Sequence, residues 1–246
     1  MLALAGVCFF APTIPLTKLL VTRLEIFELV FARMLLGGFG ALVFLGFRAL
    51  RGRVALPPVA HLPEVGLAAS GVVIGFPLLV AVALYRLPGS FGAVIAGLLP
   101  LITSVLGVVI GRERVSGWFW LPAGCGSALT IYYGMERIAF DPAILVMLAA
   151  IFTGSLGYVF GARLTQKLNR SLPETDRHAG GPLVIAWALL ISLPLAILGC
   201  VLVWPAQLPR LDLPALGALA YLGFVSQPLA AKNFRTRPYS TTVPEI

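Results

Sequence analysis

The side chains best suited to hold a solute are a few polar residues inside otherwise apolar stretches of the chain. Arg33 supplies a guanidinium, Thr13, Ser155 and Tyr158 supply hydroxyls, and Gln227 supplies an amide. Such groups bind a polar molecule through charge and hydrogen bonds. Catalysis needs clustered acids, bases or nucleophiles, and these five residues do not form such a cluster in the sequence. The polar residues Thr13, Ser155, Tyr158 and Gln227 are compatible with a shared polar cavity, or they simply form hydrogen bonds between helices.

Arg33 lies about seven residues, and hence ~10 Å, from the outer end of its apolar stretch. That depth is costly for a charge in lipid, yet a long arginine side chain can still extend to the interface. Glu28 lies five positions earlier, about 140° around a helix, so it is not a partner on the same face. Arg33 therefore either extends outward or faces a cavity, where another helix or a solute supplies its partner.

The cysteines and histidines show no pattern that indicates a cofactor. Cys8, Cys125 and Cys200 fall in separate apolar stretches, and His61 and His178 lie in loops. No spacing typical of a zinc site or a disulfide framework occurs among them. We expect no metal and no cofactor.

The composition requires a lipid environment for most of the surface. Hydrophobic residues make up 59% of the 246 residues, charged residues 11%, and the mean hydropathy is +0.97. Soluble domains usually carry about 25% charged residues. The runs lack the alternation of a membrane barrel, so we predict an all-α polytopic membrane protein. Eight runs are long enough to span: 2–20, 26–47, 65–85, 91–110, 115–134, 142–162, 181–204 and 213–231.

The basic residues indicate the orientation of the chain. The formal net charge is +8, but the lysines and arginines are dispersed in short gaps and do not form an aromatic-flanked patch, so we expect no nucleic-acid partner. The gaps after the second, fourth, sixth and eighth runs hold 12 of the 18 Lys and Arg residues. The positive-inside rule places these gaps in the cytoplasm. Both termini, including a polar tail at 232–246, would then be cytoplasmic in a cell (inner or plasma) membrane. Residues 1–17 lack a basic leader, so we interpret the first run as a spanning helix.

Prolines interrupt several of the runs. A proline inside a helix removes a backbone donor and frees the carbonyl four residues earlier, which in lipid needs a new partner or a wet cavity. In the first run Thr13 and Thr17 are local candidates to supply such a donor. Each break is either a kink repaired by neighbouring helices or part of a cavity. The predicted helix breaks lie at Pro12, Pro15, Pro77 and Pro100.

The order and spacing of several segments resemble the EamA repeat of the drug/metabolite transporter superfamily. They are FFAPTIPLTKLL, FARMLLGGFGALVFL and GSFGAVIAGLLPLITSVLGVVIGRERVSGWFW, followed by IFTGSLGYVFGARL and ALAYLGFVSQ. The proline-containing fourth run and its turn from Gly111 to Arg114 are the most specific part. The resemblance implies ten helices in two inverted five-helix repeats, with a substrate cavity between them. Here residues 1–134 would form the first repeat and residues 142–231 three helices of the second.

The resemblance also assigns roles to the polar residues. Runs 1, 3, 6 and 8 would approach the cavity, which places Thr13, Ser155, Tyr158 and Gln227 at the substrate. Arg33 would lie near the outer gate. After residue 228 the sequence departs from the pattern, which predicts a truncation or frameshift there. A homodimer would then be one way to close the open side of the cavity.

The predicted function is export or exchange of small organic metabolites, impaired if the last two helices are lost. One alternative is an integral membrane enzyme of the lipid-modifying type, and another is a non-transporting membrane remnant. The nearest acidic cluster that an enzyme might use is Glu174 and Asp176, which we interpret as a solvated loop. Glu28 is the one acid inside a run, and its position near the outer end favours exchange or facilitated movement over proton coupling. The expected partners are the substrate and the lipid bilayer.

Overall fold

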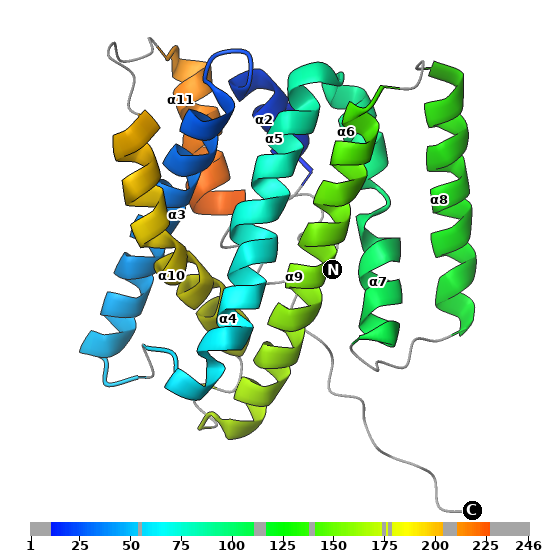
Figure 1. Cartoon of the computed structure of the whole chain (residues 1–246). Helices are drawn as coiled ribbons and strands as arrows, with labels where there is room; N and C mark the ends of the chain where they lie inside the picture. The colour runs from blue at the N-terminus through cyan, green and yellow to red at the C-terminus, as the bar shows by residue number, and fades with distance from the viewer. Residues whose placement is uncertain are drawn as a thin grey trace, which may run out of the picture.

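The computed structural model describes residues 11–53, 56–110, 117–137, 141–173, 176, 179–203 and 211–226. Within these ranges the chain forms helices joined by loops, and no strand occurs (Figure 1). Segments η2 and η4 are π-helical, and η1 is a 3₁₀-helix. In chain order the elements are α2 (Thr13–Leu20), α3 (Ile26–Leu50), η1 (Val59–His61), α4 (Leu62–Ala68), η2 (Ala69–Gly75), α5 (Phe76–Arg86), α6 (Gly89–Ala96), α7 (Leu99–Val109), α8 (Gly117–Arg137), α9 (Ala143–Ser171), α10 (Gly180–Val203), α11 (Leu213–Ala220) and η4 (Tyr221–Ser226).

The described helices confirm an all-α polytopic membrane protein. Five helical segments are long and apolar enough to cross a bilayer: Ile26–Leu50, Val59–Arg86, Gly89–Val109, Ala143–Ser171 and Gly180–Val203. Large apolar side chains such as Phe39, Phe47 and Leu202 are exposed on the outside of the bundle. In water this exposure would be costly, whereas lipid tails cover such side chains without penalty.

Successive spans alternate in direction, which gives the bundle two ends. Helix α3 runs downward in Figure 1, and the segment from α4 to α5 rises again. Arg23 lies just before the start of α3 and Arg48 lies in its last turn. We call the two ends of the bundle the Arg23 end and the Arg48 end. At the Arg23 end, Arg23 pairs with Asp212 at 3.1 Å, and Arg86 pairs with Asp141 at 3.5 Å. These pairs join segments that are distant in the sequence.

Helix α9 extends beyond the run predicted for it. The sequence predicts an end near residue 162, but the helix continues to Ser171. The extra turns are polar and find partners outside the bundle core: Arg163 donates to the carbonyl of Ile110, just after α7, and Lys167 pairs with Glu64 in the first turn of α4. A cation at a helix C-terminus and an acid at a helix N-terminus are both favourable.

The predicted helix breaks coincide with irregular backbone. The π-helix η2 ends directly before Pro77, where the N–H of Phe76 bonds the carbonyl of Gly71. Residues 97–98 separate α6 from α7, and Pro100 lies in the first turn of α7. Pro12 precedes α2 and Pro15 lies in its first turn, where a missing N–H is tolerated. Thr17 donates to the carbonyl of Thr13 at 2.7 Å rather than to a carbonyl freed by a proline. The turn 111–114 lies outside the described residues.

One segment of the chain recurs with the same architecture. An α-helical stretch followed by a π-helix forms both α4–η2 and α11–η4. The two segments start at opposite ends of the bundle (Figure 1). Helix α4 starts at the Arg48 end, where Glu64 pairs with Lys167, and α11 starts at the Arg23 end, where Asp212 pairs with Arg23. An inverted repeat produces this relation. The two segments also share residue types at the same spacing. The corresponding pairs are Leu62 and Leu213, Pro63 and Pro214, Gly66 and Gly217, Ala69 and Ala220, and Pro77 and Pro228. The repeat boundaries at 134 and 142 stay a prediction.

Candidate functional site

Arg33 lies inside the bundle. A capping box in which Glu25 and Glu28 each accept a backbone N–H starts α3, and this fixes Arg33 two turns into the helix. Only 4% of the Arg33 residue surface is exposed. A side chain extended to the interface would remain accessible, so the outward alternative is wrong. The guanidinium is enclosed by protein.

Among the residues that the structure describes, none supplies a counter-ion for Arg33. Its Nε is buried and has no hydrogen-bond partner, and no salt bridge joins it to a described carboxylate. The phenol of Tyr158 on α9 lies close enough to interact electrostatically with Arg33. Two of the five residues predicted for the site are therefore brought together from separate halves of the chain.

Helix α9 presents Ser155 and Tyr158 one turn apart, and both are buried. The hydroxyl of Thr103 on α7 donates to the Ser155 hydroxyl at 3.0 Å. Pro100 lies in the first turn of α7, directly after the break at residues 97–98, and Thr103 follows one turn later on the same helix. Thr103 was not among the predicted site residues, although its place after the proline in a lipid-length run was the available signal.

A second hydroxyl pair lies between α2 and η4. Thr13 and Ser226 are both buried, and their side-chain oxygens are 2.9 Å apart. The same π-helix packs on α3 at Arg33, where a Cβ added to Gly223 would lie 3.5 Å from the Arg33 carbonyl. Gln227, predicted for the site, lies outside the described residues. Its neighbour Ser226 was not among the predicted site residues, because a single serine at the end of an apolar run is usually a structural residue of helix packing.

Close backbone packing positions α9 beside the π-helix η2. A Cβ added to Gly71 would lie 2.6 Å from the Cα of Gly157, and one added to Gly157 would lie 2.8 Å from the backbone N of Val72. Real Cβ atoms do not approach backbone this closely, so both positions require glycine. This contact holds the α9 face that carries Ser155 and Tyr158 at a fixed distance from the third run.

Comparisons with known proteins indicate one family. The sequence profile of the EamA-like transporter family matches residues 1–135. The chain is also 34% identical over 223 residues to the uncharacterized transporter YdeK of Bacillus subtilis (strain 168), covering 90% of this chain and 72% of YdeK. The chain belongs to the EamA-like transporter family. One solved crystal structure shares the fold with a TM-score of 0.57 at 18% sequence identity, covering 94% of this chain and 79% of that one.

In this EamA-like chain, Asp176 is a buried ion-pair partner and not part of a solvated loop. Its carboxylate accepts from Arg48 at 3.0 Å and from Arg53 at 3.4 Å, and only 5% of its surface is exposed. Arg48, in the last turn of α3, is also buried. The expectation for Asp176 was wrong because loop composition does not reveal that a loop folds back under a helix end. Glu174 lies outside the described residues.

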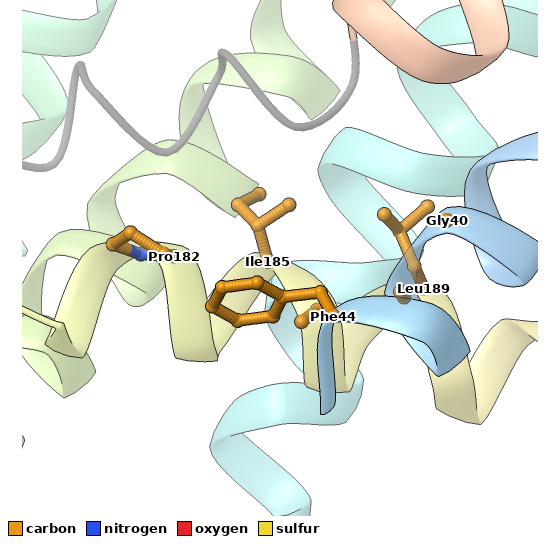
Figure 2. A pocket seen from close by; sticks show the side chains of 7 residues that line it. Gly40, Phe44, Pro182, Ile185 and Leu189 are labelled. Atoms are coloured by element: carbon orange, nitrogen blue, oxygen red, sulfur yellow. The ribbon is translucent and has the colours of Figure 1, made fainter. Parts of the chain in front are cut away.

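An apolar groove in the EamA-like bundle lies apart from the polar residues. It lies between α3 and α10 and has a volume of about 160 Å³. Figure 2 shows Phe44, Ile185 and Leu189 along it. Gly40, Ala41, Pro182 and Ala186 complete the lining. Such a lining offers no hydrogen bonds to orient a polar solute, so we do not place the candidate site in this groove. The candidate site is instead the set of polar residues described above, which we call the polar centre: Thr13, Arg33, Thr103, Ser155, Tyr158 and Ser226. No group of three metal-ligating side chains gathers in the described part of the chain.

Proposed function

We propose that this protein moves small organic metabolites across a cell membrane, by export or exchange, through the polar centre. The observation that carries the proposal is a permanently charged arginine enclosed at membrane depth. Polar and ionisable groups inside a membrane are costly and mark substrate or ion pathways. The family of the chain and its transporter-named relative support the same function.

The distribution of ion pairs supports movement by alternating access. The polar centre lies between two bundle ends that are each held by an ion pair between residues far apart in the sequence, Arg23–Asp212 at one and Arg48–Asp176 at the other. Opening one end while the other stays closed would expose Arg33 to each side in turn, as in transporters built from inverted repeats. The charge bias of the gaps supports a cytoplasmic Arg48 end.

Glu28 supports exchange or facilitated movement as the mode of transport. Its carboxylate accepts the backbone N–H of Glu25 at 3.1 Å as part of the α3 cap. A carboxylate engaged in a helix cap is a poor proton carrier, because each protonation would weaken the cap. Movement of one solute down its gradient, or against a second solute, needs no such carrier.

A counterflow experiment tests the function while the substrate is still unidentified. Proteoliposomes are loaded with a ¹³C-labelled extract of cellular metabolites and placed in the unlabelled extract. Mass spectrometry then shows which labelled compounds leave faster than from protein-free vesicles. We expect a small set of compounds to exchange. We also expect Arg33→Gln to slow the exchange by roughly tenfold or more, since charge-assisted contacts are worth about 1.5–3 kcal/mol.

The matched control for this experiment is Arg51→Gln. Arg51 is exposed at the Arg48 end and stacks on Phe47, so it carries the same charge outside the polar centre. The control variant should exchange like the unmodified protein. If no compound leaves faster than from protein-free vesicles, the proposed transport function is wrong.

A further inference from the structure

The charge of Arg33 has no compensation within the described protein. Arginine stays protonated under all physiological conditions, so this charge cannot be removed by losing a proton. The elements that pack on α3 are α5, α10, α11, η2 and η4, and none of them contains an aspartate or a glutamate. Helix α9, which carries Tyr158, contains none either.

The remaining acids near these helices are already engaged. Glu28, on α3 itself, accepts the backbone N–H of Glu25 at the helix start. Glu64 pairs with Lys167, and Asp212 pairs with Arg23. Tyr158 contributes a phenol, which is uncharged at neutral pH. No described side chain supplies the negative charge that a buried guanidinium requires.

The unpartnered atom of Arg33 indicates the form of the missing partner. Nε and one terminal nitrogen form an edge of the guanidinium with two parallel N–H donors, and this edge matches the two oxygens of a carboxylate. In Arg33 the Nε donor on that edge is buried and unused. The hydroxyls of Tyr158 and Ser155 lie along the adjacent face of α9, where they can bind further polar groups of the same molecule.

We propose that the polar centre recognises small organic carboxylates, with the Nε edge of Arg33 as the counter-ion of the substrate. This proposal rests on the proposed transport function and adds the chemical class of its substrate. Binding would supply the missing negative charge, so the protein discriminates a carboxylate from its uncharged amide. Specificity of this kind arises because the amide leaves a buried charge unpaired.

Matched pairs of probes test the substrate class. The purified protein in lipid nanodiscs is heated with benzoate or benzamide, and with succinate or succinamide, and its midpoint of thermal unfolding is followed. We expect a carboxylate to raise the midpoint while its amide does not, because only a ligand that binds the folded state stabilises it. Arg33→Gln should abolish this difference, Arg33→Lys should retain part of it, and Arg51→Gln should leave it unchanged. Equal shifts by acid and amide, or a preference that persists in Arg33→Gln, would overturn the proposal.

A second measurement needs no ligand. If Arg33 has no protein counter-ion, replacing it by the uncharged Arg33→Met removes an uncompensated buried charge, and the ligand-free protein should unfold at a higher temperature than the unmodified one. If Arg33 instead completes an ion pair within the protein, the same variant unfolds at a lower temperature, which contradicts the proposal. Counterflow of uncharged compounds that continues in Arg33→Met would refute the carboxylate class and leave the transport function standing. Absence of all counterflow would refute the function itself.

Discussion

At the scale of single residues, burial separates two arginines that look alike in the sequence. Arg33 and Arg48 lie on the same helix and are both buried, yet Arg48 has Asp176 at 3.0 Å whereas Arg33 has no described carboxylate. Removing one partner of a buried pair leaves an uncompensated charge. For Arg33, our proposal is that the substrate supplies the partner. We assign stability to the first and binding to the second.

The Asp176 pair gives a prediction for stability. Asp176→Asn keeps the shape of the side chain but removes the negative charge beside Arg48, and we expect a loss of about 3–5 kcal/mol in unfolding free energy. The same change at the half-exposed pair, Asp212→Asn beside Arg23, should cost about 0–1 kcal/mol, since solvent screens that pair and asparagine still caps α11. Denaturant titration of both variants in detergent measures the difference. Equal losses would show that burial of the Arg48 pair does not matter.

At the scale of elements, the π-helices are the feature that sequence reasoning located only in part. Proline positions predicted breaks at Pro77 and Pro100, and irregular backbone occurs at both. The π-helical form of η2 was not predicted, because a proline indicates that a helix is interrupted but not which hydrogen-bond pattern precedes the interruption. The same limit applies to the site: polar residues inside apolar runs indicated Arg33 and Tyr158. That Arg33 of α3 and Tyr158 of α9 lie close enough to interact electrostatically depends on the tertiary fold, and no spacing along the chain reveals it.

The contact between η2 and α9 gives a prediction at this scale. Gly71→Ala places a methyl group 2.6 Å from the Cα of Gly157, so the two helices must separate. We expect strong destabilisation and loss of counterflow, because the α9 face that carries Ser155 and Tyr158 would move. Gly66→Ala is the matched control: it lies in α4, where an added Cβ meets nothing within 4 Å. The control should be neutral or stabilise by up to about 1 kcal/mol, as alanine favours helix. Similar behaviour of the two variants would contradict the role of this contact.

At the scale of the whole molecule, charge bias and folding pattern agree on two distinct ends. The count of lysines and arginines in alternate gaps predicts which side of the membrane each end faces, and the spans do alternate in the structure. Composition was sufficient for this level because lipid-length apolar runs leave few alternatives to a helical bundle. It was insufficient at the helix ends, where α9 continues to Ser171 because its last turns find partners on neighbouring elements.

The sidedness of α3 can be measured directly. Thr22 lies before the helix at the Arg23 end, Arg51 lies just after it, and both are exposed. In a background without the three native cysteines, Thr22→Cys should react with a membrane-impermeant thiol reagent added to intact cells. Arg51→Cys should react only after the cells are opened, because the Arg48 end carries the excess of positive charge. Labelling of both positions from the same side would mean that α3 does not cross the membrane. The reverse labelling pattern would show that α3 crosses the membrane in the opposite orientation. Because successive spans alternate in direction, this one pair of variants determines which end of the bundle faces the cytoplasm.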